Sequence, residues 1–182
     1  MRIASIIFAF LIPVAVQAAN APVKPLLESL FGELAQAASP EDAKPIEDRI
    51  EAIFLQSGSP SVDLLMLRVA AAQTAGDKVT AKKLIEAVTG VAPKYAEGWH
   101  SLANFQRATG DDVGAMTSLE RVILLNPREF SALAELGSML EDYGNKAAAL
   151  KIYRKVLELD PQLDGARRHV DALARDVEGQ GI

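Results

Sequence analysis

The chain has 182 residues, of which 49% are hydrophobic and 24% charged, a balance typical of a globular protein that can bury a core. Its formal net charge is −5, so the molecule as a whole has no electrostatic attraction for nucleic acid or an anionic membrane. The absence of cysteine excludes disulfides, thiolate metal ligands and a cysteine nucleophile. Aromatic residues make up only 5%, which favours closely packed helices over a sheet.

The first 18 residues have the pattern of a secretory signal peptide. Arg2 precedes an apolar run over 3–16, and small residues at Val16 and Ala18 occupy the two positions that a signal peptidase reads. The run has about 14 residues and contains Pro13, so it is short of the ~20 needed to span a membrane. We therefore expect a leader over 1–18 that is cleaved to give an exported, periplasmic protein without a stable membrane span. An uncleaved membrane anchor is the alternative.

Two amphipathic helices are predicted next. Residues 20–25 are polar and proline-rich, which indicates a mobile lead before the first helix. Leucines spaced over 26–34 mark the apolar face of that helix. Ser39 followed by Pro40 is typical of a helix N-cap and first position, so a second helix begins there or just beyond Pro45. Its buried face is predicted to carry Ile46, Ile50, Ile53 and Phe54.

The chain then repeats itself with a period of 34 residues, over 62–95, 96–129 and 130–163. Each unit has a turn glycine in its middle and a proline near its end, which is the arithmetic of a helix-turn-helix solenoid. The first unit fits less well, because Arg68 stands at a leucine position and Gly90 interrupts the end of its second helix. In the other two units, the corresponding pairs include Trp99 with Leu133, Gly110 with Gly144, Val122 with Val156 and Pro127 with Pro161.

At these residues the sequence resembles the tetratricopeptide repeat (TPR) family. The family pattern W-x2-L-G-x2-Y, A-x3-F and P is represented by Trp99, Leu102, Ala103, Gln106, Ala115, Leu119 and Pro127, and by Leu133, Leu136, Gly137, Leu140, Ala149, Tyr153 and Pro161. The resemblance implies an all-α, right-handed α-solenoid of helix-turn-helix repeats. It also implies that the chain binds a protein or peptide and is not an enzyme.

The segments that flank the repeats are predicted to close the two ends of the array. The hairpin within 19–61 does not follow the 34-residue pattern, because Glu47 and Glu51 fall where small and aromatic residues would stand. We interpret it as an N-terminal cap that covers the first repeat, since an end repeat otherwise leaves an apolar face in water. Residues 164–182 are predicted to form a C-terminal capping helix and tail, with Val170 and Leu173 on the apolar face of that helix.

Catalytic and cofactor signals are weak. The two histidines, His100 and His169, belong to different parts of the array, and no serine lies in a nucleophile motif. Glu97 and His100 are three residues apart on one helix, so they could bind a metal or move a proton, but a third ligand is missing. We therefore expect a surface pair without a chemical role, no cofactor and no metal; a metal or catalytic protein centred on His100 is the least favoured hypothesis.

The resemblance implies a partner-binding concave face, lined by the first helix of each repeat. Only Asn104 matches the basic and asparagine residues with which some TPR grooves clamp a C-terminal carboxylate, so that ligand is not favoured. The residues expected to contact a partner are Asp63, Met66, Gln73, Glu97, His100, Asn104, Arg107, Ser138, Glu141, Asp142, Arg168 and Arg175.

Two functions are compatible with these sequence features. The first is an exported interaction module that holds a segment of another envelope protein in its concave groove, which is acidic over the repeats and basic at the closing helix. The second is a self-assembling structural component, with a homo-oligomer formed through the N-terminal hairpin or the convex face.

Overall fold

The computed structural model describes residues 23–179, and the predicted leader over 1–18 lies outside them. All regular secondary structure in the described part is helical, which confirms the all-α prediction. No helix in this part is both long and apolar enough to span a membrane. The helices are α1 (Val23–Leu34), α2 (Pro40–Phe54), α3 (Pro60–Thr74), α4 (Lys78–Val91), α5 (Ala96–Ala108), α6 (Asp112–Leu125), α7 (Phe130–Asp142), α8 (Lys146–Leu159) and α9 (Ala166–Glu178).

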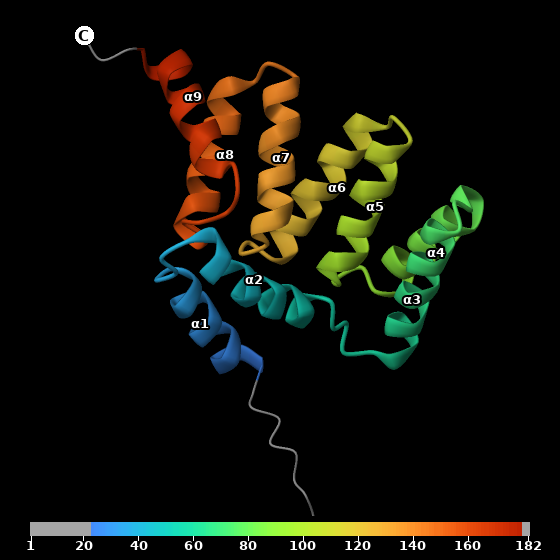
Figure 1. Cartoon of the computed structure of the whole chain (residues 1–182). Helices are drawn as coiled ribbons and strands as arrows, with labels where there is room; N and C mark the ends of the chain where they lie inside the picture. The colour runs from blue at the N-terminus through green and yellow to red at the C-terminus, as the bar shows by residue number, and fades with distance from the viewer. Residues whose placement is uncertain (1–22, 180–182) are drawn as a thin grey trace, which may run out of the picture.

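The six helices from α3 to α8 form three antiparallel pairs that follow one another in an arc (Figure 1). Each pair turns at a glycine with positive φ, as predicted. The residue after that glycine caps the second helix, because its side chain accepts a hydrogen bond from the backbone N–H three residues further on. The three turns are Gly76-Asp77, Gly110-Asp111 and Gly144-Asn145.

Small residues allow the helices of the array to pack closely. Gly137 of α7 lies against the ring of Tyr153 from α8, and a Cβ at this position would come within 3.1 Å of the ring carbon Cζ. Between the second and third repeats, Leu136 packs with Val122 and Met139 in a buried cluster. The second and third repeats therefore share an apolar interior, and Ile123, Leu140 and Ile152 border both this cluster and the next one toward α9, as expected for a solenoid.

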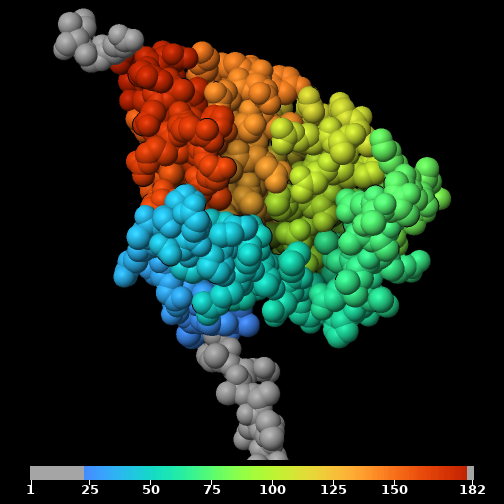
Figure 2. Space-filling view, viewed as in Figure 1, coloured from blue at the N-terminus to red at the C-terminus, as the bar shows by residue number. Residues whose placement is uncertain are grey.

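The N-terminal hairpin, α1 and α2, does not cover the first repeat, so that prediction was wrong. Its apolar side packs against Phe130 at the start of α7, which is only 1% exposed, and against Leu159 and Leu163 at and after the end of α8. Figure 2 shows the hairpin, in blue and cyan, lying against the orange and red part of the chain. A polar contact joins the same parts, because Nε2 of Gln162 donates to the carbonyl of Ala37 at 3.1 Å.

Several helix ends differ from the predictions. Helix α1 already begins at Val23, so Pro25 stands in its first turn and not in a lead segment. Helix α2 begins at Pro40, with Ser39 accepting a hydrogen bond from the backbone N–H of Asp42, so the earlier of the two predicted starts is right. Helix α4 continues through Gly90.

The closing helix α9 packs against α8 through one face. Ala166 and Leu173 are buried there, and Val170 is partly buried against the same cluster. Gly165, with φ of 77°, stands directly before the first residue of α9, and the helix lies beside α8 in Figure 1. The predicted C-terminal helix is therefore present and begins two residues after its expected start.

Candidate functional site

The concave face is built by α3, α5 and α7, and it is hollowed by a cavity between α3 and α5. We call it the α3–α5 cavity; its volume is about 500 Å³. Met66 and Ala70 of α3 contribute apolar surface, while Asp63 and Glu97 contribute carboxylates. The full lining is Leu55, Gln56, Asp63, Met66, Leu67, Val69, Ala70, Gln73, Tyr95, Glu97 and Ser101. This lining is mostly apolar, and it contains two acids and no Lys or Arg.

The linker after α2 forms one wall of the α3–α5 cavity. The hydroxyl of Tyr95 donates to the carbonyl of Leu55 at 2.6 Å, and the backbone N–H of Ser57 donates to Oδ1 of Asp63 at 3.1 Å. The side chain of Leu55 is left 55% exposed. The linker is thus fixed to the first repeat and presents an apolar side chain beside the opening.

Gln73 connects this cavity to a second, smaller one of about 250 Å³ between α3, α4 and α5. Asn104 and Phe105 line the smaller cavity, and Asn104 is exposed, as predicted for a concave-face residue. Four of the predicted partner-binding residues surround the larger cavity, and Asn104 lies in its neighbour. The four are Asp63, Met66, Gln73 and Glu97.

His100 is buried, in contrast to the surface pair that the sequence predicted. It is 8% exposed, with Nε2 lying 3.0 Å from Oε1 of Glu135 in α7 and Nδ1 lying 3.5 Å from Oε2 of Glu97. Burial by itself would lower the pKa of His100, but hydrogen bonds to Glu135 and Glu97 and the charges of these two carboxylates raise the pKa to about 10.

The protonated state of His100 determines what this group can do chemically. An imidazolium has no free lone pair, so it can neither ligate a metal nor accept a proton as a general base. Among residues 23–179, no three His, Cys, Asp or Glu side chains are grouped so as to hold a metal ion. The environment of His100 therefore favours an ion-pair role that ties α5 to α7.

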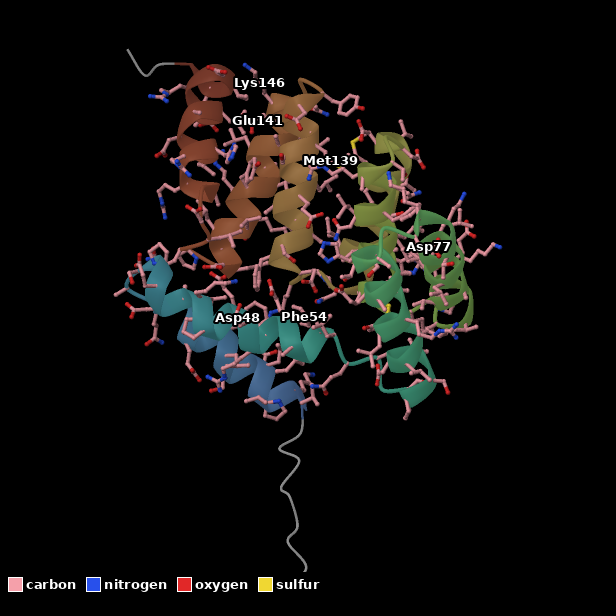
Figure 3. All side chains as sticks on the ribbon, turned by 45° about the vertical axis from the view of Figure 1, so that its right-hand side comes forward. Asp48, Phe54, Asp77, Met139, Glu141 and Lys146 are labelled. Carbon is pink, nitrogen blue, oxygen red and sulfur yellow. The ribbon has the colours of Figure 1, made fainter. Side chains whose placement is uncertain are left out.

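The C-terminal end of α2 covers the region around His100. A cavity of about 270 Å³ lies here, and Figure 3 labels Phe54 on the part of α2 that borders it. The cavity is lined by Glu51, Phe54 and Leu55 from the hairpin and linker, and by Glu97, His100, Glu129, Ser131 and Glu135 from the repeats. We call it the covered cavity, because the hairpin lies over it.

Carboxyl groups at the covered cavity bind protons more tightly than usual. Burial raises the pKa of Glu129 to about 7, and the charge of Glu97 adds to that effect, although the charge of His100 and hydrogen bonds from Ser131 and Asn126 oppose it. Burial also raises the pKa of Glu51, which is closer to the hairpin surface. The negative charge of this region therefore depends on pH near neutrality.

The remaining predicted residues stand on α5, α7 and α9 and do not line the cavities described above. Oε2 of Glu141 lies 2.7 Å from Nδ1 of His169, whose ring stacks on Tyr153 with a centroid distance of 4.6 Å. Arg168 lies 3.7 Å from Asp164 across two highly exposed side chains, a contact that contributes little. The structure thus separates the predicted partner-binding residues into two groups, one around the cavities and a second that does not line them. Of the others in this second group, Arg107, Asp142 and Arg175 are exposed and Ser138 is partly buried.

Sequence reasoning missed Glu135, Glu129 and the linker residue Leu55. Glu135 could have been found from the repeat, because it follows His100 by 35 residues, one more than the period, and so stands on the first helix of the next repeat at nearly the same height. No periodic signal could have located Leu55, since it belongs to a linker outside the repeats.

Comparisons with known proteins agree with this geometry. A tetratricopeptide repeat family model matches residues 130–163, the same 34 residues as the third unit. A TPR repeat-containing protein of Rhizobium etli is 29% identical over 161 residues, which cover 88% of this chain and 79% of the relative. The similarity therefore extends beyond the three repeats into the flanking segments.

Two solved structures show the same fold at low sequence identity. MamA matches with a TM-score of 0.58 and 15% identity over 86% of this chain and 84% of its own. The first TPR domain of Spaghetti, bound to an HSP90 peptide, matches with a TM-score of 0.58 and 16% identity over 64% of this chain and 93% of its own. These likenesses confirm the solenoid fold; the third unit matches the tetratricopeptide repeat model, and most of the chain is similar to a TPR repeat-containing protein.

Proposed function

We propose that the chain is an exported interaction module that binds a segment of another envelope protein on its concave face. Its repeat family and fold are typical of non-catalytic scaffolds for protein interaction. The observation that carries the proposal is the α3–α5 cavity, in which apolar side chains such as Met66 and Leu67 lie beside the carboxylates of Asp63 and Glu97.

The composition of the α3–α5 cavity indicates what kind of segment fits it. Leu67 is 68% exposed and Leu55 is 55% exposed, so apolar surface is available for a partner to bury. The two acids make the edge negative, and a basic residue of the partner would complement them. We therefore expect a peptide with an apolar side chain next to Lys or Arg. The Spaghetti domain, which shares the fold, is bound to a peptide in its structure.

Peptide selection with a matched pair of variants tests this function. Peptides are selected on the folded chain from a random library, and their affinities are measured for Ala70→Arg and Ala71→Arg. Both alanines are exposed on α3, but only Ala70 lines the cavity. Filling the cavity should weaken binding at least about tenfold, as overpacking does, while Ala71→Arg should bind as the wild type does. Equal affinity for both variants would show that peptides bind elsewhere.

Export is the second part of the proposal and is supported by the signal-peptide pattern over 1–18. The test is to isolate the protein from its native cells and determine its N-terminus. Export with cleavage predicts a mature chain that begins at Ala19 and is recovered with the periplasmic proteins. Recovery of a chain beginning at Met1 from the cytosol would contradict this part alone.

Self-assembly is a second candidate, favoured by the outer face of α3. Leu64 is 59% exposed, whereas the residues at the corresponding positions of the next two repeats, Gly98 and Ala132, are buried. The first repeat therefore leaves its stacking face without a neighbour among residues 23–179. Sedimentation over a range of concentrations tests this candidate: a dimer that Leu64→Asp abolishes would support it, and a monomer at all concentrations would exclude it.

A further inference from the structure

The hairpin meets the repeats through like charges. Glu47 and Glu51 stand one turn apart on the side of α2 that faces the repeats, and Glu47 is only 6% exposed. Glu51 lines the covered cavity together with Glu97 and Glu129. These two glutamates of α2 are also the residues that break the 34-residue pattern of the sequence. A helix that docks with acids against acids gains its stability from other contacts.

Glu47 faces a second buried carboxyl group, that of Asp160 at the end of α8. Asp160 is fully buried; its Oδ1 accepts a hydrogen bond from the backbone N–H of Gln162 at 3.0 Å, while Oδ2 has no hydrogen-bond partner among the described residues. Two carboxyl groups can hydrogen-bond to each other only when one of them is protonated. The contact between Glu47 and Asp160 is therefore satisfied when the pair holds one proton and is repulsive when it holds none.

Apolar and cationic contacts hold the hairpin in place against this repulsion. Phe130 packs against the hairpin core, with its ring nearly at right angles to that of Phe31 and 6.4 Å away. The guanidinium of Arg128 lies 3.6 Å from the centroid of the Phe31 ring, and its Nη1 lies 2.7 Å from Oε1 of Glu28. The docked hairpin is thus a balance between a favourable apolar contact and an acidic one.

The chain is built so that the hairpin can leave the third repeat without disturbing the first. Residues 55–59 join α2 to α3 and contain Gly58, whose φ is 74°. Tyr95 and Asp63 bind this linker to the first repeat, as described above. The linker therefore stays in place as an anchor, and the hairpin that precedes it is attached to the third repeat chiefly by the contacts at Phe130, Arg128 and Asp160.

We propose that the hairpin is a pH-sensitive clasp, docked while the buried carboxyl of Asp160, which faces Glu47, holds a proton and released when that proton is lost. Release would uncover the acidic surface around His100 and Glu135, so that a basic partner segment could extend from the α3–α5 cavity along the concave face. The consequence for binding rests on the proposed function; the clasp itself does not.

The pKa values at the contact all point in the same direction. Burial raises the pKa of Asp160 to about 6, and the charge of the neighbouring Glu47 carboxylate adds to this effect. Burial also raises the pKa of Glu51, and that of Glu129 to about 7. A group whose pKa is raised by docking stabilises the docked state below its undocked pKa and loses this contribution as the pH rises through its docked pKa. Docking should therefore weaken between about pH 4 and pH 7.

The other charged groups near the contact do not reverse the predicted weakening of docking as the pH rises. The cations remain charged between pH 4 and pH 7. Most of the acids that pair with them on the hairpin surface are about half exposed or more, so solvent screens these pairs. These groups are Lys44 with Glu47 and Asp48, Arg49 with Glu33, Arg128 with Glu28, and His100 with Glu97 and Glu135. For Asp160 alone, the rise in pKa from 3.8 to about 6 limits the change in the docking equilibrium to roughly a hundredfold, reached if the whole rise is due to docking.

Native-state hydrogen exchange measures docking without any partner. The two hairpin helices have 12 and 15 residues, so they are marginal once they lose their contact with the third repeat, and their amides exchange on release. After correction for intrinsic rates, we expect the protection of α1 and α2 to fall by more than tenfold and up to about a hundredfold from pH 4 to pH 7, while α5 to α8 keep theirs.

Three variants and a control test whether the contact between Glu47 and Asp160 causes the pH dependence of docking. In Glu47→Gln and Asp160→Asn, the new amide can donate to the remaining carboxylate, so hairpin protection should stay high and vary less than about tenfold over the same pH range. Glu120→Gln, at an exposed position of α6, is the matched control and should keep the full response. Phe130→Ala should lower the protection of the hairpin at every pH, which reports docking to the third repeat independently of the charges.

The clasp is overturned if wild-type hairpin protection is independent of pH, if Glu47→Gln and Asp160→Asn keep the wild-type response, or if the hairpin exchanges only together with α5 to α8. None of these measurements involves a peptide. Failure of the peptide selection would therefore count against the proposed function and leave the clasp standing, and failure of the exchange experiment would do the reverse.

Discussion

Nε2 of His100 lies 3.0 Å from Oε1 of Glu135, and the two residues are separated by 35 positions in a chain whose repeat is 34. The bond therefore links adjacent repeats, from α5 to α7, on the concave side. Because His100 is also 3.5 Å from Glu97, one buried cation is shared between two carboxylates. Removing one member of such a group costs folding free energy, because the remaining charges stay buried without compensation.

Replacing His100 with alanine should destabilise the protein substantially. Glu97 and Glu135, whose side chains are 18% and 28% exposed, would lose their shared cation, and breaking a buried pair in this way costs about 3 kcal/mol. His169→Ala is the matched control: its side chain is 43% exposed and its bond to Glu141 is closer to solvent, so we expect about 1 kcal/mol or less. Urea unfolding at pH 5, where the hairpin is docked over His100, measures both, and similar losses would contradict the ion-pair role of His100.

The same residue predicts how stability depends on pH. The folded pKa of His100 is about 10, above the usual histidine value of 6.5, so its stabilising contribution is complete below about pH 6.5 and is lost as the pH rises toward 10. The contacts of His100 with Glu97 and Glu135 lie within the repeats and persist when the hairpin is released, so the free energy of unfolding should fall across this range in the wild type. In His100→Ala the fall should be much smaller. A wild-type profile that is flat from pH 6.5 to 10 would contradict the raised pKa.

The raised pKa of Glu129 predicts a second pH range, below that of His100, over which stability changes. Its pKa is raised from 4.5 to about 7, so the folded state takes up a proton as the pH falls, and stability from this group is lost as the pH rises from about 4.5 through 7. Glu129→Gln should reduce that dependence, to which Asp160 and Glu51 also contribute, and leave the slope at higher pH unchanged. Unfolding experiments on the wild type and on the two single variants separate the windows, because each variant should reduce the slope only in its own.

The repeats could be predicted from the sequence because their signals are local and periodic. A glycine with positive φ, a cap residue after it and small residues at fixed spacing recur in each unit, as Gly110, Asp111 and Ala115 show. Each of these constraints acts within one helical pair, so it can be recognised without knowing where distant segments lie.

The position of the hairpin could not be predicted in the same way. Its apolar face, with Ile50 at its centre, indicates that it is buried but not against what. The decisive partner is Phe130, which follows Ile50 by about 80 residues and occupies the position of Ala96 in the preceding repeat. The burial of His100 follows from that same fold-back, because the end of α2 covers it. Sequence reasoning therefore assigned His100 to the solvent-exposed surface, although the structure buries it.

Core and concave-face positions should differ in their sensitivity to truncation. Leu136 is 5% exposed within the cluster between the second and third repeats, so Leu136→Ala should cost about 2–5 kcal/mol. Asn104 is exposed beside the smaller cavity, and Asn104→Ala should change stability by no more than about 0.5 kcal/mol. Thermal or urea unfolding measures both, and a loss at Asn104 as large as that at Leu136 would mean that the two faces have been exchanged.

The last prediction concerns the charge of the α3–α5 cavity. Reversing Glu97 and Glu141 to lysine would also break the contacts to His100 and His169, so it would not leave the fold unchanged. The neutral Glu97→Gln keeps an acceptor for His100 and removes one of the two negative charges at the cavity.

For a selected peptide that carries Lys or Arg, Glu97→Gln should lower the association rate several-fold at low salt, because charge complementarity acts mainly on encounter. The difference should shrink as ionic strength rises and the Debye length falls below about 10 Å. Asp142→Asn removes an equal charge from an exposed position that does not line the cavity and should leave the rate unchanged. Stopped-flow measurements at two salt concentrations decide the matter, since an equal effect of both variants would mean that net charge, and not the α3–α5 cavity, steers the peptide.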